Sequence, residues 1–236
     1  MPSLSAASRA ALKKVSSATL TTVLFKRGLR NTFIQGVFLL NKSAPRMVGE
    51  AYTLRFIPAR EDLDLLGAFE GRGHPQREAI EACPPGQVLV MDARRDASAA
   101  TGGDILLTRL MVRGAAGIVT DGGLRDSQTI EKLAWPAYCG GRSAPLNLVR
   151  HHAVESQVPI GCGGVAVYPG DVLVGDEEGV VVIPAKMAEE VAAEAAAQSE
   201  FEDWVEAKVK EGRSIFGLYP PSAQTKAEYE AWKKSR

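Results

Sequence analysis

Cysteine and histidine are scarce in this chain. Its three cysteines, Cys83, Cys139 and Cys162, are odd in number, lie far apart and form no CxxC pair. Disulfide frameworks and thiolate zinc sites require more cysteines at closer spacing. We therefore expect reduced thiols, as in a cytoplasmic protein.

Net charge and long apolar runs are also missing. The 28 Lys and Arg residues balance 28 Asp and Glu residues, so no net positive field attracts nucleic acid phosphates. No stretch approaches the roughly 18 apolar residues of a membrane span, and no apolar run of signal-peptide length follows the N-terminus. The sequence predicts a soluble, cytoplasmic protein with neither nucleic acid nor membrane as a partner.

What remains is a chain with enough apolar content for a large core. It has 236 residues, of which 45% are hydrophobic, and chains of this size bury most of their apolar surface. We predict a single α/β domain over residues 1–236, with a core at about 15–185 and a C-terminal helical arm at about 186–236.

Apolar periodicity and turn residues divide the chain into expected elements. Helices are expected at residues 5–28, with a break near Ser16-Ser17, and at 61–69, 77–81, 104–113, 126–133 and 185–210. Strands are expected at residues 48–57, 87–92, 117–120, 135–139, 165–167 and 172–183. Tight turns are expected at Asp121-Gly122-Gly123 and at residues 161–164.

Two glycines, Gly102 and Gly103, precede the helix expected to start at Asp104. The first N–H groups of a helix have no partner within the helix, and together with the helix dipole they form a binding place for a carboxylate or phosphate. The alternative is structural, because Asp is also a common helix cap and glycines commonly shape loops.

Twenty residues separate Asp104 from Arg125 and Asp126. One helix, one turn and one strand fill this interval, so both ends can converge on one cleft. A carboxylate beside a guanidinium can serve two roles at one site, because Asp126 can bind a hard cation while Arg125 contacts an oxyanion. A surface ion pair or a turn is the alternative interpretation of Arg125 and Asp126 alone.

The whole string of Gly102-Gly103-Asp104, 20 residues and Arg125-Asp126 resembles the signature of the class II pyruvate aldolases typified by 4-hydroxy-4-methyl-2-oxoglutarate aldolase. These enzymes share a fold with the regulator of ribonuclease activity (RraA) family. The similarity extends to residues 17–24, 49–53, 135–136, 169–171 and 176–184. It implies an RraA-like fold of the swivelling ββα type known from phosphohistidine domains, with helical N- and C-terminal arms.

The resemblance also implies roles for individual residues. Arg125 would contact the 2-oxo group of the substrate, and Asp126 would ligate Mg²⁺ or Mn²⁺. The substrate's carboxylate end would be surrounded by Gly103, Asp104, Ile105 and Leu106. Relatives assemble as trimers or pairs of trimers, with a neighbour's acidic residue near the metal, a role that Glu200 or Glu202 could fill here.

These roles lead to a mechanistic hypothesis for the predicted metal-dependent carbon–carbon lyase. Arg125 and the cation polarise the 2-oxo group while the C3–C4 bond of a 4-hydroxy-2-oxo acid breaks, releasing pyruvate. Asp104 holds the water that moves the protons. The same chemistry permits decarboxylation of oxaloacetate, and an alternative substrate is a 3-deoxy-2-oxo or 2,4-dioxo sugar acid.

A second class of function is a non-catalytic regulator that binds a ribonuclease, as some relatives do. Those regulators commonly lack the acid that Asp126 supplies, which favours the enzyme. This chain also departs from the aldolases, since it is longer and carries Thr22 where many have Asp. His74, expected in a mobile segment, and the His151-His152 pair, expected at a helix end, lack metal-ligand spacing.

Overall fold

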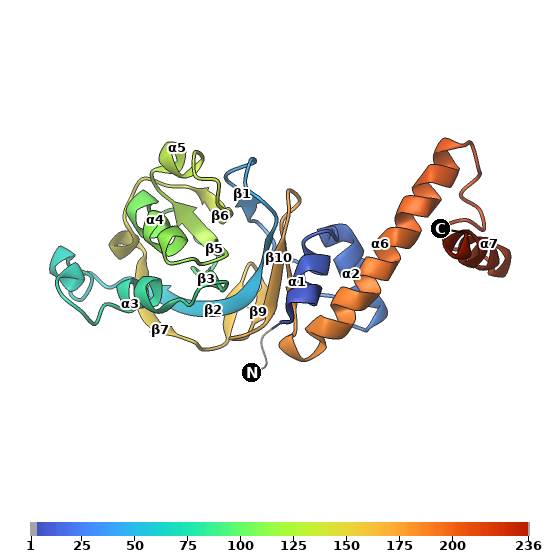
Figure 1. Cartoon of the computed structure of the whole chain (residues 1–236). Helices are drawn as coiled ribbons and strands as arrows, with labels where there is room; N and C mark the ends of the chain where they lie inside the picture. Colours follow the sequence, from blue (N-terminus) through green and yellow to red (C-terminus); the bar gives the residue numbers. More distant parts are fainter. Residues whose placement is uncertain (1–3, 236) are drawn as a thin grey trace.

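A computed structural model describes residues 4–235; residues 1–3 and 236, which fall within the expected arms, lie outside the described residues. Figure 1 shows a curled sheet with helices on both sides, and one helix near the C-terminus is much longer than the others. The predicted α/β architecture with a helical C-terminal region is confirmed.

Parallel strands form the centre of the sheet, in the spatial order β6-β5-β3-β2. They are β2 (Met47–Pro58), β3 (Val88–Asp92), β5 (Gly117–Leu124) and β6 (Ala137–Arg142). Two short strands extend this layer: β4 (Ala100–Gly102) pairs in parallel with the end of β5, and β1 (Phe38–Leu39) pairs antiparallel with β6.

Antiparallel strands complete the sheet on the other side of β2. The long strand β2 pairs with β10 (Val172–Gly175) along its first part and with β7 (His151–Ser156) along its last part. Strand β11 (Val180–Ile183) follows β10 in a hairpin. A separate two-stranded sheet is formed by β8 (Ile160–Cys162) and β9 (Val165–Val167).

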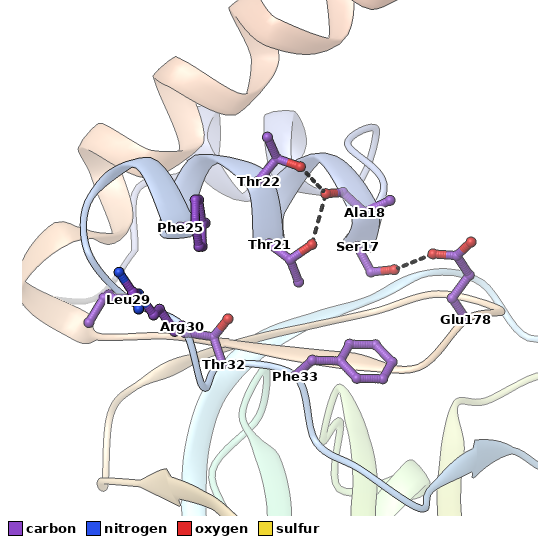
Figure 2. Close-up of a pocket in the computed structure, with 10 residues that line it drawn as sticks. All are labelled: Ser17, Ala18, Thr21, Thr22, Phe25, Leu29, Arg30, Thr32, Phe33 and Glu178. Atoms are coloured by element: carbon purple, nitrogen blue, oxygen red, sulfur yellow. Dashed lines mark hydrogen bonds between the residues drawn. The ribbon is translucent and has the colours of Figure 1, made fainter.

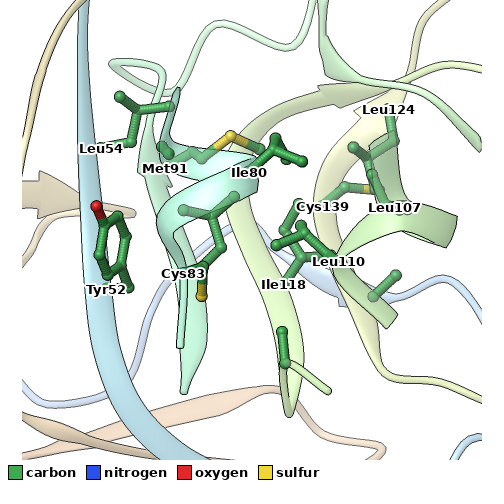
Figure 3. Packing of buried hydrophobic residues seen from close by; sticks show 14 of the residues in the cluster. Tyr52, Leu54, Ile80, Cys83, Met91, Leu107, Leu110, Ile118, Leu124 and Cys139 are labelled. Atoms are coloured by element: carbon green, nitrogen blue, oxygen red, sulfur yellow. The ribbon is translucent and has the colours of Figure 1, made fainter. Parts of the chain in front are cut away.

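Both faces of the central sheet are buried, which explains the continuous apolar runs of its strands. In β3, Leu89 and Met91 face one core while Val88 and Val90 face the other, because successive side chains of a strand alternate. Figure 3 shows the first core, where leucines of α4 meet Ile80 of α3. The helices on this face are α3 (Pro75–Ala82), α4 (Asp104–Val112) and α5 (Ser127–Ile130).

The expected break in the first helix is confirmed at Ser16. The Ser16 hydroxyl accepts a hydrogen bond from the Thr19 N–H at 3.0 Å, capping a new helix as serine commonly does. The two helices, α1 (Ala6–Leu12) and α2 (Ser17–Lys26), bury leucines and valines together with the first half of α6 (Ala188–Lys210).

The second half of α6 extends away from the sheet, as Figure 1 shows. There it forms a small core with α7 (Ala223–Lys234) through Trp204, Leu218 and Tyr229. Within residues 4–235, three 3-10 turns complete the elements, at Leu66–Phe69, Asn147–Val149 and Ala185–Met187.

The expected turn at Asp121-Gly122-Gly123 is wrong, because β5 continues through these residues to Leu124. The glycines instead permit close packing: a Cβ on Gly122 would lie 2.6 Å from Ala93 Cβ, and one on Gly123 would lie 2.8 Å from the Ala99 oxygen. Asp121 is buried, and its carboxylate accepts backbone N–H bonds from Ala93, Arg95 and Gly163.

Several boundaries also differ from expectation. Strand β6 begins at Ala137 rather than at residue 135, since the buried Trp135 precedes the strand and donates its indole N–H to the Ala115 oxygen at 2.7 Å. His151 and His152 begin strand β7 rather than end an α-helix. Among residues 4–235, no helix is long and apolar enough to cross a membrane.

Candidate functional site

Helix α4 begins where the sequence places its start. Gly103 occupies the cap position in an extended conformation, and Asp104 is the first helical residue. The Asp104 carboxylate accepts a hydrogen bond from the Ile105 N–H at 2.7 Å. The N–H groups of Asp104 and Leu106 therefore remain for an anion at this helix end.

Arg125 and Asp126 follow directly after β5. Asp126 adopts the left-handed conformation, with φ of 56° and ψ of 34°, and precedes α5. Outside glycine this conformation is uncommon, although Asp tolerates it better than most residues. The Arg125 Nε–H donates to Asp126 Oδ2 at 3.2 Å, and the two side chains are 44% and 37% exposed.

Gly103 brings the two ends of the motif together. A Cβ on this residue would lie 2.6 Å from Asp126 Oδ2 and 2.9 Å from Arg125 Cγ. Both side chains therefore pass directly over the backbone that leads into α4. The Arg125 N–H also donates to the Gly102 oxygen at 3.1 Å, which fixes the end of β5 against this segment.

A pocket of about 250 Å³ surrounds this contact. Every residue proposed for the site from the sequence lies on its wall, and so do side chains from α3 and from the segment after β6. The lining residues are Phe69, Gln76, Arg77, Gly102, Gly103, Asp104, Ile105, Leu106, Arg125, Asp126, Leu146 and Asn147.

Five of these wall residues escape sequence reasoning: Phe69, Gln76, Arg77, Leu146 and Asn147. Gln76 is buried, and its side chain donates to the Thr101 oxygen at 2.6 Å. The Arg77 guanidinium lies 4.6 Å above the centre of the Phe69 ring. No motif or spacing in the sequence marks these positions.

The donor set of the pocket fits a cation that retains most of its water ligands. Within the described part of the chain, no three His, Cys, Asp or Glu side chains gather into a metal cluster. Mg²⁺ and Mn²⁺ accept one protein carboxylate together with waters, whereas structural zinc needs four protein ligands. Asp126, with one oxygen bonded to Arg125 and the other directed to no described donor, would hold such an ion.

A second pocket, of about 530 Å³, lies between α2, the segment at residues 29–33 and Glu178 in the turn between β10 and β11 (Figure 2). It includes Thr22, where many aldolases carry Asp. The Thr22 hydroxyl donates to the Ala18 oxygen at 3.1 Å, so it is bonded within its own helix. None of residues 102–106, Arg125 and Asp126 lines this second pocket.

The acidic residues expected near a neighbour's metal differ in their surroundings. Both Glu202 oxygens are engaged within this chain: one accepts from Thr19, and the other from Gln198 and Tyr219. Glu200 is exposed.

The expected mobile segment around His74 forms the entry to α3. His74 occupies the N-cap position of that helix without a side-chain cap hydrogen bond, and it packs edge-on against Phe69, with ring centres 4.9 Å apart. Burial, followed by the positive charge of Arg77, lowers the pKa of His74 below its usual range. The His74 ring lies beside Phe69, which lines the pocket.

A model of the RraA-like family, described as Aldolase/RraA, matches residues 14–182. The chain belongs to the RraA-like family. The matched region contains the helix start at Asp104 and the Arg125–Asp126 pair, so the predicted family and fold are confirmed.

Solved structures have the same RraA-like fold. Streptomyces coelicolor RraAS2, described as an unusual member of the RNase ES inhibitor RraA protein family, is 30% identical, with a TM-score of 0.76 over 87% of this chain and 98% of its own. An uncharacterised protein from Pseudomonas syringae pv. tomato is 23% identical, with a TM-score of 0.79 over 93% of this chain and 100% of its own.

A sequence relative carries an enzyme's name. The Halalkalibacterium halodurans protein named "Putative 4-hydroxy-4-methyl-2-oxoglutarate aldolase" is 39% identical over 114 residues, 48% of this chain. The matched segment spans 54% of that relative's length. Legionella pneumophila DlpA is 30% identical over 146 residues, which cover 62% of this chain and 23% of DlpA.

Proposed function

We propose that this RraA-like protein is a divalent-metal-dependent lyase that cleaves 4-hydroxy-2-oxo acids, such as 4-hydroxy-4-methyl-2-oxoglutarate, to pyruvate, and that it also decarboxylates oxaloacetate. The observation that carries the proposal is the contact of Arg125 and Asp126 with Gly103 at the first turn of α4. A guanidinium, a carboxylate and unpaired backbone N–H groups thereby face one pocket of small-molecule size.

Each group has a defined task in the proposed reaction. The N–H groups of Asp104 and Leu106 bind the C1 carboxylate at the positive end of α4. Arg125 uses Nε to hold Asp126, so its terminal nitrogens are left to contact the 2-oxo oxygen. A divalent cation at Asp126 would supply Lewis-acid polarisation of the same oxygen.

Cleavage breaks the C3–C4 bond and sends its electrons towards the 2-oxo oxygen, where Arg125 stabilises the resulting enolate charge. The C4 hydroxyl gives up its proton as it becomes a carbonyl, and C3 gains one as pyruvate forms. One oxygen of Asp104 is held by the Ile105 N–H, which leaves the other to position the water that moves these protons.

The deciding experiment measures pyruvate release, coupled to lactate dehydrogenase, from 4-hydroxy-4-methyl-2-oxoglutarate and from oxaloacetate. Each substrate is tested with Mg²⁺, with EDTA and with the Asp126→Ala variant. We expect pyruvate release from the intact protein with Mg²⁺, and little or none with EDTA or from Asp126→Ala. Release that is insensitive to both EDTA and the substitution would contradict a metal role for Asp126.

A 3-deoxy-2-oxo or 2,4-dioxo sugar acid is the alternative substrate within the same chemistry. The C-terminal segment, residues 215–235 with helix α7, is the part of the chain that could reshape the far end of such a substrate's pocket. Including a 2,4-dioxo acid in the same assay ranks the substrates by kcat/KM.

Ribonuclease binding is a second candidate function of another class. It is supported by the 30% identity to a protein from the RNase ES inhibitor RraA family. Inhibition of a purified ribonuclease by this protein, undiminished in Asp126→Ala and without pyruvate release from any substrate, would favour the regulator over the enzyme.

We further propose a cytoplasmic homotrimer or hexamer with its sites between subunits. Ile105 supports this assembly, because this apolar residue lies at the pocket and is 78% exposed, as expected where a second subunit covers it. Light scattering coupled to size exclusion measures the assembly, and a monomer would exclude a contribution from Glu200 of a neighbouring copy.

A further inference from the structure

Residues 59–73, which we call the flap, connect the end of β2 to α3. Figure 1 shows the flap as a loop that projects from the body of the protein ahead of α3. Leu63, Leu65 and Leu66 of the flap are 49%, 60% and 73% exposed. The Asp64 side chain among them is only 3% exposed. The flap therefore turns an acid, rather than its leucines, towards the body of the protein.

Asp64 links the flap to the sheet. Its Oδ1 lies 2.8 Å from His152 Nδ1 on β7, and its Oδ2 accepts the Arg60 N–H at 2.7 Å. Because an ionised carboxylate only accepts hydrogen bonds, Nδ1 is the donor. Among the hydrogen bonds and ion pairs of residues 4–235, the contact of Asp64 with His152 is the one that joins residues 60–72 to the rest of the protein. We call this contact the latch.

Little else restrains the flap. None of its residues belongs to a hydrophobic core in the described part of the chain, and segments with few buried apolar contacts open at a low cost in free energy. Gly71 and Gly73 lie near its C-terminal end with φ of 72° and 104°, and a Cβ on either would meet nothing within 4 Å. Glycine permits the backbone to rotate here, so the flap can move when the latch opens.

The flap reaches the candidate pocket through Phe69. This ring forms part of the pocket wall and lies beneath the Arg77 guanidinium at the start of α3. The 3-10 turn Leu66–Phe69 connects the ring to Asp64. A buried carboxylate is unfavourable without a partner, so Asp64 would move towards water if His152 were lost. That movement would displace Phe69 and open one side of the pocket.

We propose that Asp64 and His152 are positioning residues, which hold the flap in place so that Phe69 completes the pocket wall. This inference rests on the proposed lyase function, because it concerns the same pocket. Neither Asp64 nor His152 lines the pocket, so both act on the reaction through Phe69. Loss of the latch then weakens substrate binding and leaves unchanged the groups that break the C3–C4 bond.

Two variants break the latch. His152→Leu removes the donor and Asp64→Ala removes the acceptor, and KM and kcat are measured for pyruvate release with Mg²⁺. When the closed flap is only partly populated, the apparent affinity for substrate falls by the same fraction. We expect KM to rise by about 10-fold in each variant, as for the loss of one hydrogen bond to a charged group, while kcat stays within about 2-fold.

His152→Asn is the rescue variant, because the asparagine amide places an N–H close to the position of Nδ1. Its KM should return towards that of the intact protein. The double variant of His152→Leu with Asp64→Ala should have the KM of either single variant, since residues that act only through each other are not additive. Asp62→Ala is the matched control: this exposed acid pairs with Arg60 inside the flap, so KM should be unchanged.

Cleavage by trypsin after Arg72 measures opening of the flap without catalysis. Arg72 is an exposed residue of the flap, and cleavage of a segment that opens transiently follows the population of its open form. Mass spectrometry of the fragments separates this site from others. We expect His152→Leu and Asp64→Ala to be cut there about 10-fold faster than the intact protein, whereas Asp62→Ala should be cut at the rate of the intact protein.

The outcomes separate this proposal from the function on which it rests. Pyruvate release with an unchanged KM in both latch variants would overturn the positioning role and leave the lyase intact. A lower kcat at unchanged KM would overturn it as well, because the two residues would then act on the chemical step. No pyruvate release from the intact protein would overturn the lyase and the role of the flap in it. Equal cleavage rates at Arg72 in all variants would overturn the latch itself.

Discussion

Gly103 and Asp126 approach each other so closely that a single added carbon would not fit between them. The ideal Cβ position at residue 103 lies 2.6 Å from Asp126 Oδ2, well inside van der Waals contact. Residues 103 and 126 are far apart in sequence, and each lies at the end of a regular element. Glycine at this position is therefore a condition for the arrangement of the site.

The first prediction follows from this contact. Gly103→Ala should displace the Arg125 and Asp126 side chains and lower kcat/KM for pyruvate release by about 100-fold, since misplacement by about 1 Å has effects of that size. The melting temperature should change little, because both displaced side chains are partly exposed. Gly67→Ala is the control, as a Cβ there would meet nothing within 4 Å. Equal activity of the two variants would contradict the assigned geometry.

Arg125→Lys tests the guanidinium itself. Lysine keeps the positive charge but cannot both hold Asp126 and contact the 2-oxo oxygen, because it lacks the planar fork of donors. We expect kcat to fall by about 100- to 1000-fold, as for other charge-stabilising donors. Arg109→Lys, in an exposed pair with Glu81, should retain full activity. A kcat within a few fold of the intact protein would exclude the proposed role of Arg125.

The sequence predicts those site residues that are marked by their immediate neighbours in the chain. Glycines before an expected helix place Asp104 at its first turn, and an apolar run followed by Arg125-Asp126 places that pair at a strand end. Asn147 belongs to an irregular segment, and Arg77 is one of several charged residues on a surface helix. Only tertiary packing brings these two to the pocket, so no spacing in the sequence reveals them.

The sequence predicts strands where consecutive apolar residues are buried, as in Val88 to Met91 of β3. The prediction failed at Asp121-Gly122-Gly123, because glycine pairs mark turns in sequence but here allow close contact with Ala93 and Ala99. Strand β7 was missed because it alternates buried and partly exposed positions within a polar run, and its pairing with distant β2 defines it.

Asp126→Asn separates charge from backbone conformation. Asparagine tolerates the left-handed conformation at least as well as aspartate, so the melting temperature should be retained. Loss of the carboxylate should weaken Mn²⁺ binding in calorimetric titration by at least about 10-fold, the effect of losing even an indirect contact to a metal. Asp62→Asn, an exposed carboxylate paired with Arg60, is the control. Unchanged Mn²⁺ affinity in Asp126→Asn would place the cation elsewhere.

Acid sensitivity of the fold should depend on His151. This ring is fully buried; Nδ1 lies 3.2 Å from the Arg94 guanidinium, which can only donate, and Nε2 lies 3.3 Å from the Ala99 oxygen. Burial, and then the charge of Arg94, lowers the pKa of His151 below 6.5, although Asp96 acts in the opposite direction. The folded protein therefore holds a neutral imidazole.

Because the pKa of His151 is lower in the folded chain than in the unfolded chain, the unfolded chain binds the proton first as pH falls. Stability is then fully present above the unfolded pKa of about 6.5 and decreases as pH falls from there towards the folded value. His151→Gln, which can still donate to the Ala99 oxygen, should flatten the decline of melting temperature between about pH 7.5 and pH 5.5. His74, whose pKa burial also lowers, should leave a smaller residual slope. A variant with the full slope of the intact protein would show that other groups govern this range.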